Sequence, residues 1–299
     1  MGVGNAELIR GEMTRVASAV DHGRNAATTT PLAEVSGSAE AAARTGLVVP
    51  AFAVLDAPSL SKPGPLTRLL EKWFFREATV TKVQVMSQHF RLITLAGEDL
   101  RGVAWVPGQK VQINVGGDAV RTFTPISWDP IAGETRILVY VHGQGPGAAW
   151  AAWTQVGMTC AVFGPRRSLT LDMGAAGLTF VFGDETSFGL ALAFGASLSA
   201  SEAIASLFEV SSVEEAERVW RALSTDPVTF VPRTVGGGHL DTLERRTLEI
   251  VDDWEPDRFV LTGDAASIQR VRRTLRGREI VSARIRAKAY WAAGKTGLD

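Results

Sequence analysis

The sequence predicts a two-domain protein in which an antiparallel β-barrel precedes an α/β domain with a five-stranded parallel sheet. Two patterns along the 299 residues predict this division. From residue 76 to about 172, short strand-like segments are separated by turns containing Gly and Pro, which is typical of a small antiparallel barrel or sandwich. After about residue 176, strand-like segments alternate with helices of about a dozen residues, which is typical of parallel βαβ units with helices on both faces.

Three segments are expected along the chain. Residues 1–62 are rich in Ala, Thr, Ser and Gly and have poor apolar periodicity, so we expect a mostly disordered extension. The barrel domain is expected at 63–175, entered through a short helix at 66–75, and the α/β domain at 176–299. Candidate barrel strands lie at 78–87, 90–97, 110–117, 120–128, 135–143, 158–164 and 168–173, with one helical segment at 147–153. Candidate strands of the α/β domain lie at 178–184, 203–210, 227–233, 257–264 and 281–291, and candidate helices at 186–199, 213–223, 239–251 and 265–277.

The overall composition limits the possible functions. The formal net charge of −1 gives no general electrostatic reason to bind nucleic acid or anionic lipid. Cys160 is the only cysteine, which excludes an intrachain disulfide and a thiolate metal cluster, and the four histidines lack metal-binding spacing. There is no run of about 18 apolar residues, and the N-terminus lacks the apolar core of a secretory signal. We therefore expect a cytoplasmic protein with no resident metal, no nucleic-acid partner and no membrane insertion.

The segment RTFTPIS at 121–127 combines a cation, an aromatic ring and hydroxyl groups. In an extended strand, Arg121 and Phe123 share one face while Thr124 points to the other. The segment therefore fits either an edge strand with a solvated Arg and a half-buried Phe, or a surface that holds a flat, anionic ligand.

The Gly-rich turn HGQGPGAAW at 142–150 follows a candidate barrel strand. Gly143, Gly145 and Ala148 satisfy the spacing of a dinucleotide-binding fingerprint, but the preceding strand belongs to the barrel-like half. Pro146 suits the first helical turn, where its missing N–H costs nothing. The free N–H groups and the dipole of the following helix favour an anion, so phosphate binding and a simple connection into a short helix both fit.

Two strand-end loops in the second half share one shape. FGDETSFGLA at 182–191 ends the first parallel strand, with Glu185 and Thr186 at the start of the next helix. FVLTGDAAS at 259–267 repeats this shape three strands later. Because ligands bind outside the carboxyl ends of parallel strands, both loops can border a nicotinamide site. A capped helix start explains the same residues without any ligand.

Taken together, these segments resemble the siderophore-interacting proteins, a branch of the ferredoxin-reductase-like flavoproteins. Along 73–294, the motifs that carry the resemblance are RTFT at 121–124, HGQGPGAAWA at 142–151, VFGPRRS at 162–168, FGDETSF at 182–188 and YWAAG at 290–294. The resemblance implies a Greek-key barrel that binds FAD and an α/β domain that receives NADH or NADPH.

The resemblance also implies roles for individual residues. Arg121 would pair with the FAD phosphates, and Phe123 supplies the flat ring where relatives have Tyr. Thr124, the candidate catalytic residue, would place a hydroxyl or N–H near the reactive edge of the isoalloxazine. The other implied cofactor-binding residues are His142, Gly145, Pro146, Ala148, Ala149, Trp150, Gly183, Asp184, Glu185, Thr186 and Trp291.

The chain departs from this family pattern at three places. Ile126 stands where relatives often carry a second Arg, and Ala149 stands where they often carry Ser. Each loss is expected to weaken pyrophosphate binding by about one to a few kcal/mol unless it is replaced. Alanines at 292–293 follow the terminal Tyr-Trp pair, where basic residues are usual.

The aromatic pair Tyr290 and Trp291 ends the last candidate strand. Alternation places the two side chains on opposite faces, so at most one can face the flavin from the strand itself. In related reductases a terminal aromatic residue covers the isoalloxazine, and we expect Trp291 to have a neighbouring role. The alternative is that both side chains close the hydrophobic face of the α/β domain.

The predicted function is an NAD(P)H-dependent flavin oxidoreductase that reduces a small-molecule partner, a ferric siderophore, and releases iron as Fe(II). Flavin can take a hydride and pass electrons singly to Fe(III), and Fe(II) matches the hard siderophore oxygens less well. The basic residues Arg166, Arg167, Arg284, Arg286 and Lys288 are either a surface that attracts the anionic chelate or ordinary solvated charges. Two alternatives stay open, namely a flavin reductase of the same architecture with another electron acceptor, and a non-catalytic siderophore- or flavin-binding protein.

Overall fold

The computed structural model describes residues 75–117, 119–143, 145–169 and 176–294. The expected extension at 1–62 lies outside the described residues, as does the expected entry helix except for its last residue, Phe75. Phe75 begins the first strand instead. Within the described part, no helix is long and apolar enough to cross a membrane.

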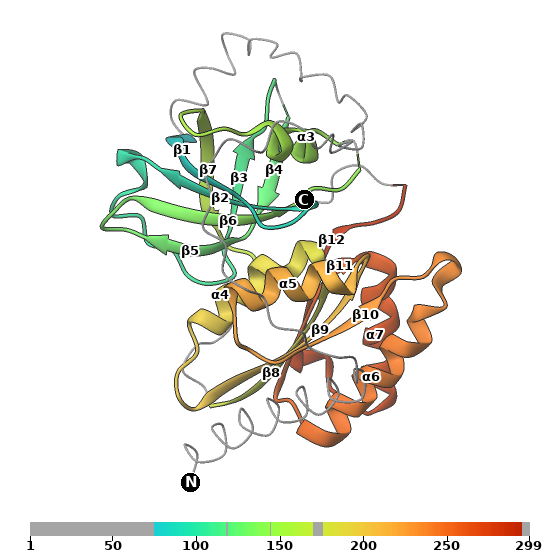
Figure 1. Ribbon diagram of the computed structural model, residues 1–299. Helices are drawn as coiled ribbons and strands as arrows, with labels where there is room; N and C mark the ends of the chain where they lie inside the picture. The colour runs from blue at the N-terminus through green and yellow to red at the C-terminus, as the bar shows by residue number, and fades with distance from the viewer. Residues whose placement is uncertain (1–74, 118, 144, 170–175, 295–299) are drawn as a thin grey trace, which may run out of the picture.

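The first half forms a seven-stranded antiparallel sheet with the order β4-β3-β7-β1-β2-β6-β5 (Figure 1). Its strands are β1 (Phe75–Val85), β2 (Phe90–Ala96), β3 (Lys110–Asn114), β4 (Val120–Phe123), β5 (Pro125–Asp129), β6 (Glu134–Tyr140) and β7 (Thr159–Arg166). A 3-10 turn, η1 (Glu98–Leu100), follows β2, and one helix, α3 (Pro146–Trp153), lies between β6 and β7. The sheet curls into a barrel-like shape, but its edge strands β4 and β5 do not pair with each other, so the barrel is not closed.

The single strand expected at 120–128 is wrong, because the chain changes partners at Thr124. β4 pairs with β3, whereas β5 pairs with β6 at the opposite edge of the sheet. Pro125 begins β5, which is an edge strand. The N–H that proline lacks is therefore not missing from the hydrogen bonds of a central strand. The last expected barrel strand is also not observed in its described residues, because Ser168 and Leu169 lie beyond the end of β7 and outside any strand.

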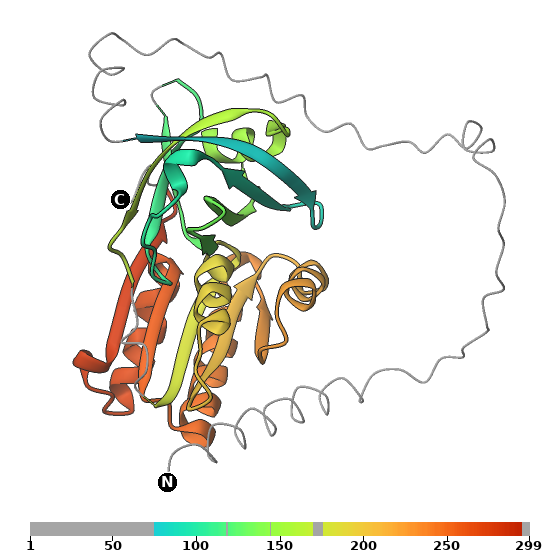
Figure 2. The ribbon, with the colours of Figure 1, turned by 90° about the vertical axis from the view of Figure 1, so that its left-hand side faces the viewer.

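The second half is a five-stranded parallel sheet with the order β10-β9-β8-β11-β12. Its strands are β8 (Gly177–Asp184), β9 (Glu202–Val210), β10 (Val228–Pro232), β11 (Arg258–Asp264) and β12 (Ile285–Trp291). The helices are α4 (Phe188–Ala196), α5 (Val213–Leu223), α6 (His239–Trp254) and α7 (Ala265–Gly277), with 3-10 turns η2 (Glu185–Ser187), η3 (Val235–Gly237) and η4 (Ser282–Arg284). Helices α4 and α5 pack on one face of the sheet and α6 and α7 on the other (Figure 2), as the sequence predicted.

One hydrophobic core joins the two halves. Phe90, Leu92 and Ile126 of the barrel belong to the same buried cluster as Phe188 and other residues of α4, α5 and β9. The phenyl rings of Phe90 and Phe188 stack with centroids 5.4 Å apart. Because α4 directly follows the end of β8, this packing holds the carboxyl end of the parallel sheet against the barrel.

The contact between α4 and the barrel is close at the point where β4 becomes β5. A Cβ placed on Gly189 of α4 would lie 2.9 Å from the carbonyl oxygen of Thr124. Only a glycine therefore allows this approach. The result is that Thr124 lies at the boundary between the two halves.

Candidate functional site

Arg121 and the start of α3 lie side by side on the barrel. A Cβ placed on Gly147, in the first turn of α3, would lie 3.1 Å from Cγ of Arg121. Arg121 is exposed, and its Nη1 donates a hydrogen bond to the carbonyl oxygen of Val120 at 2.8 Å. The structure therefore places Arg121 beside the Gly-rich turn.

The N-terminus of α3 has the features of an anion site. Gly145 is the N-cap residue and makes no side-chain cap, and Pro146 follows at the first helical position. A Cβ added at Gly143 or Gly145 would meet no atom within 4 Å, so the space above this turn is open. Uncapped N–H groups, the helix dipole and the neighbouring guanidinium suit a phosphate group. The residues present therefore fit the pyrophosphate of FAD.

The rest of the 142–150 segment lies against the barrel core. Ala148, Ala149 and Trp150 are buried, and the Trp150 ring lies 5.7 Å from the Phe123 ring between centroids. His142 stacks on Tyr140 with centroids 5.4 Å apart, and desolvation lowers the pKa of its imidazole. Because the preceding strand, β6, is antiparallel, the glycine spacing of this segment does not belong to a βαβ dinucleotide fold.

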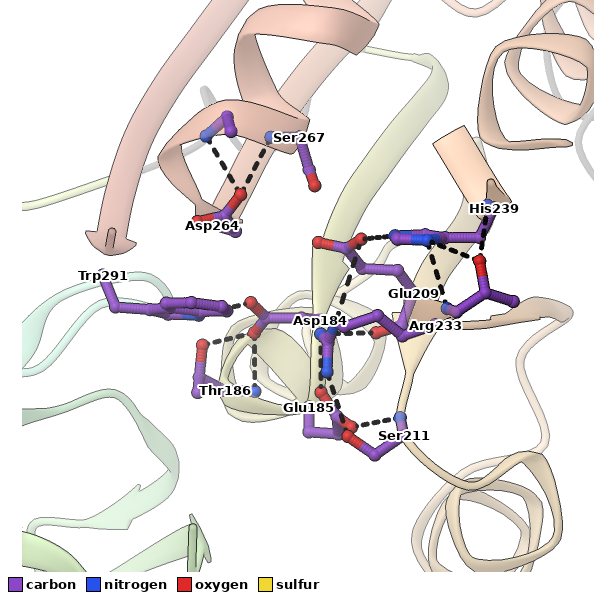
Figure 3. A network of polar contacts seen from close by, with 12 residues as sticks. Asp184, Glu185, Thr186, Glu209, Ser211, Arg233, His239, Asp264, Ser267 and Trp291 are labelled. Atoms are coloured by element: carbon purple, nitrogen blue, oxygen red, sulfur yellow. Dashed lines mark hydrogen bonds and ion pairs between the residues drawn. The ribbon is translucent and has the colours of Figure 1, made fainter. Parts of the chain in front are cut away.

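Asp184 ends β8 and is the most constrained acid of the site (Figure 3). Its Oδ1 accepts hydrogen bonds from the backbone N of Thr186 at 2.8 Å and from Thr186 Oγ1 at 2.5 Å. Its Oδ2 accepts a hydrogen bond from Nε1 of Trp291 at 2.6 Å. Burial raises the pKa of Asp184 to about 6, although these hydrogen bonds favour the carboxylate.

Two glycines leave room for Asp184 and its turn. A Cβ on Gly183 would lie 2.3 Å from Oγ of Ser187. Gly263, at the end of the adjacent strand β11, has a φ of 93°, and a Cβ there would lie 2.5 Å from Oδ2 of Asp184. β8 and β11 are neighbours at the point where the order of the strands in the sheet reverses. The ends of these two strands therefore meet around the Asp184 carboxylate.

Glu185 is buried and holds Arg233, which follows β10. Oε1 of Glu185 accepts from the backbone N of Ser211 at 2.5 Å, and Oε2 accepts from Nη2 of Arg233 at 3.1 Å. Nη1 of Arg233 donates to Oγ of Ser211 at 3.0 Å. The Arg233 guanidinium carbon also lies 5.9 Å from the centroid of the Trp291 ring. Side chains from β10 and β12, the two edges of the sheet, thus meet over the end of β8.

Glu209 and His239 extend this group of polar side chains. Nε2 of His239 lies 2.9 Å from Oε2 of Glu209, and the backbone N of Thr234 donates to Nδ1 of His239 at 3.2 Å. Nδ1 therefore acts as an acceptor, which places the imidazole proton on Nε2. Nε of Arg233 lies 4.0 Å from the same Glu209 oxygen.

The terminal aromatic pair points to two different partners, as strand alternation predicted. The Trp291 indole donates a hydrogen bond to Asp184, whereas the Tyr290 hydroxyl interacts with the Thr124 side chain. Burial raises the pKa of Tyr290 above its usual value. Each ring thus makes a polar contact in addition to its packing. Tyr290 is the residue that links Thr124 to the end of the parallel sheet.

Several residues of this site were not predicted from the sequence. Glu209, Ser211, Arg233, His239 and Tyr290 were not singled out as site residues. The signal that points to the first three is their position at the carboxyl ends of β9 and β10, where parallel sheets bind ligands.

The proposed basic surface does not gather at this site. Arg284 donates hydrogen bonds to the carbonyls of Pro256 and Asp257, which precede β11 at the opposite end of the sheet. Arg166 donates to Oε1 of Gln112, and Nζ of Lys288 lies 3.2 Å from Oγ of Ser168. These cations make separate structural contacts. Among the described residues, no group of three or more His, Cys, Asp or Glu is placed to hold a metal ion.

Comparisons with known proteins agree with the fold and with the barrel motifs. The family described as "Siderophore-interacting FAD-binding domain" matches residues 116–169, which include Arg121, Thr124 and α3. A siderophore utilization protein from T. fusca is 24% identical, with a TM-score of 0.62 over 75% of this chain and 95% of that one. The siderophore-interacting protein SipS from Aeromonas hydrophila is 22% identical, with a TM-score of 0.62 over 75% of this chain and 93% of that one.

A more distant structure shares the same architecture. A ferredoxin NADP+ reductase from Neisseria gonorrhoeae, solved with bound FAD and NADP, is 15% identical, with a TM-score of 0.56 over 73% of this chain and 99% of that one. No curated protein matches the chain. The structural comparisons confirm the predicted ferredoxin-reductase-like fold, and the family match supports FAD binding by the barrel. In the sequence of residues 116–169 and in its fold, the chain thus resembles the siderophore-interacting FAD-binding flavoproteins.

Proposed function

We propose that the protein is an NAD(P)H-dependent flavin oxidoreductase that reduces ferric siderophores and releases iron as Fe(II). The observation that carries this proposal is the position of Thr124, whose carbonyl oxygen lies against Gly189 of α4 and whose side chain interacts with the Tyr290 hydroxyl. Thr124 lies in the segment that matches an FAD-binding family, and Tyr290 lies at the carboxyl end of the parallel sheet. A flavin held beside Thr124 and a nicotinamide held at the strand ends would therefore meet at one place.

Each half of the chain is proposed to bind one of the two cofactors. Residues 63–175 would bind FAD, with Arg121 and the first turn of α3 on the pyrophosphate and Phe123 and Thr124 beside the ring system. Residues 176–299 would bind NAD(P)H at the loop formed by 183–186. When bound, FAD accepts two electrons as a hydride and donates them one at a time.

The protein's own residues position the reactants and supply no bond-forming group. Thr124 orients the cofactor edge, and its hydroxyl is held by Tyr290. Asp184 holds the Trp291 indole at the boundary between the halves. The overall reaction balances as one NAD(P)H and two Fe(III) giving NAD(P)+, two Fe(II) and one proton.

Anaerobic turnover with a ferric siderophore tests the proposed acceptor. Oxidation of NADH or NADPH is followed by absorbance while an Fe(II)-specific chromogenic chelator traps the product. We expect two Fe(II) for each donor oxidised, and a matched reaction with free FAD in place of the protein controls for non-enzymatic reduction. Oxidation of NADH or NADPH without formation of Fe(II) would exclude the ferric siderophore as the electron acceptor. It would not contradict an oxidoreductase activity with another acceptor.

A second candidate acceptor is a small quinone or an electron-transfer protein. The observation that favours it is the dispersion of the basic residues, since Arg284 is bound at the far end of the sheet. Small Ala side chains also stand at 292–293, after the terminal aromatic pair. Under this candidate, a water-soluble quinone supports faster donor oxidation than any ferric siderophore in the same assay.

A further inference from the structure

The carboxyl ends of β8, β9 and β10 are rich in buried negative charge. Asp184, Glu185 and Glu209 are 1%, 5% and 1% exposed. Within the described segments 184–187, 209–213 and 232–238, Arg233 is the only Lys or Arg. These three segments therefore contain three carboxylates and one guanidinium, and Figure 3 shows these side chains beside one another.

The Arg233 charge is already neutralised by the protein. Nη2 is 3.1 Å from Oε2 of Glu185, and Nε is 4.0 Å from Oε2 of Glu209. Nη1 donates to Oγ of Ser211 at 3.0 Å. Nη1 and Nη2 thus donate hydrogen bonds within the protein, and 27% of the side chain is exposed. Arg233 is therefore placed as an internal counter-ion to Glu185 and Glu209.

His239 adds no positive charge to this group. Because its Nδ1 accepts a hydrogen bond from the backbone N of Thr234, the single ring proton lies on Nε2 and faces Glu209. A neutral imidazole satisfies the Glu209 carboxylate without cancelling its charge. The net charge at these strand ends is negative.

The position of this charge bears on the nucleotide that can bind. In parallel sheets of this kind, a dinucleotide crosses the carboxyl ends of the strands at the switch in strand order. The adenosine ribose meets the end of the second strand, where an acidic residue favours a free 2′-hydroxyl and an available Arg favours a 2′-phosphate. Here the second strand in chain order is β9, which ends beside Glu209 and Ser211.

We propose that the protein selects NADH over NADPH, with Glu185 and Glu209 as the specificity-determining residues. This inference rests on the proposed function, because it concerns the donor of that same site. Glu185 and Glu209 act through Arg233, the only Lys or Arg in the described segments at these strand ends, by pairing with its guanidinium. They also repel a 2′-phosphate, which carries up to two negative charges.

The first test is direct binding to the wild-type flavoprotein, measured by calorimetry with ADP-ribose and 2′-phospho-ADP-ribose. These probes lack the nicotinamide, so the readout does not depend on catalysis. We expect ADP-ribose to bind at least about tenfold more tightly, which corresponds to about 1.4 kcal/mol. The kcat/KM for NADH is expected to exceed that for NADPH by a similar factor.

A charge-neutral variant tests the assignment to Glu209. Glu209→Gln retains an oxygen that can accept from His239 while removing one negative charge. We expect the affinity for 2′-phospho-ADP-ribose to rise about three- to tenfold and the affinity for ADP-ribose to change less. The matched control is Glu217→Gln, which makes the same charge change at an exposed site of α5, where Glu217 pairs with Arg221, and is expected to change neither affinity.

The possible outcomes separate this inference from the proposed function. Tighter binding of 2′-phospho-ADP-ribose, or a preference for NADPH, overturns the inference and leaves the flavin oxidoreductase standing. Failure of both probes to bind, together with no oxidation of either donor, overturns the inference and the proposed donor site together. A Glu209→Gln protein that does not fold leaves the wild-type comparison as the deciding result.

Discussion

At the scale of single residues, the site combines exposed cationic groups on the barrel with buried anionic groups on the parallel sheet. Arg121 is exposed beside an uncapped helix start, whereas Asp184 is buried and bonded by Thr186 and Trp291. The two environments suit different parts of the proposed chemistry. Phosphate needs accessible donors, and the boundary with the ring systems needs fixed side chains.

Arg121→Ala is expected to release FAD while leaving the fold intact. The side chain is exposed, and removing a charge-assisted phosphate contact costs on the order of 1.5–3 kcal/mol, or about tenfold to over a hundredfold in affinity. Fluorescence titration of the apoprotein with FAD measures the change. Arg101→Ala, at an exposed arginine elsewhere on the barrel, is the control. Unchanged FAD affinity in Arg121→Ala would show that Arg121 is only a surface residue.

Asp184 is expected to make the stability of the protein fall as the pH rises through about 6. Its pKa is raised from 3.8 to about 6, so the folded state binds the proton more tightly than the unfolded state. The stabilisation from the protonated Asp184 carboxyl is complete below the pKa that this group has in the unfolded protein. It is lost as the pH rises and the carboxyl ionises in the folded protein. Relative to Asp184→Asn, the wild-type free energy of unfolding should fall by about 1–1.5 kcal/mol between pH 5 and pH 7.5.

Urea denaturation of both proteins at the two pH values measures this difference. The variant is the reference because it has no titrating group at position 184. A wild-type protein that gains stability relative to Asp184→Asn over the same range would contradict a raised pKa.

At the scale of elements, helices were predicted better than strand ends. α5 and α7 have the bounds expected from apolar periodicity, and each begins at a side-chain cap, Ser212 or Asp264. The break at Thr124 was not predicted, because it depends on β4 and β5 pairing with opposite edges of the sheet. The Glu209–Arg233–His239 group was missed for the same reason, since residues from separate loops meet only in the folded sheet.

β12 is the element that connects the two proposed cofactor sites, and Trp291→Phe tests it. The variant keeps an aromatic ring but removes the N–H that donates to Asp184. We expect the KM for NADH or the rate of flavin reduction to change by about tenfold, with a small change in Tm.

Trp254→Phe is the matched control, because Trp254 packs at the far end of α6 against a small hydrophobic cluster. It is expected to alter stability only. If Trp291→Phe lowers only the Tm and leaves the KM for NADH and the rate of flavin reduction unchanged, Trp291 is not part of the donor site.

At the scale of the whole molecule, the shared hydrophobic core makes the two halves a single unit. Ile126, one of the departures from the pattern of the resembled family, is 8% exposed and belongs to the cluster that includes α4. The departure from the family pattern therefore has a structural consequence, because an Arg at this place would enter an apolar core. The site lies where this core fixes one half against the other.

Ile126→Ala is expected to destabilise both halves together. Loss of a buried Ile costs about 2–5 kcal/mol, and the cluster spans the boundary. Unfolding followed by FAD release and by far-UV circular dichroism should shift to the same lower midpoint. Ile131→Ala is the control, since Ile131 is 84% exposed. Two separate transitions in the wild type would contradict a continuous core.

The central claim is that a flavin bound at residues 121–124 receives electrons from a nicotinamide at the end of the parallel sheet. The anaerobic visible spectrum of the purified protein, recorded before and after addition of NADH, tests this claim most directly. We expect the two flavin absorbance bands between about 350 and 500 nm and their rapid bleaching by NADH through hydride transfer. A protein that stays colourless after incubation with FAD, or a bound flavin that neither NADH nor NADPH bleaches, would contradict it.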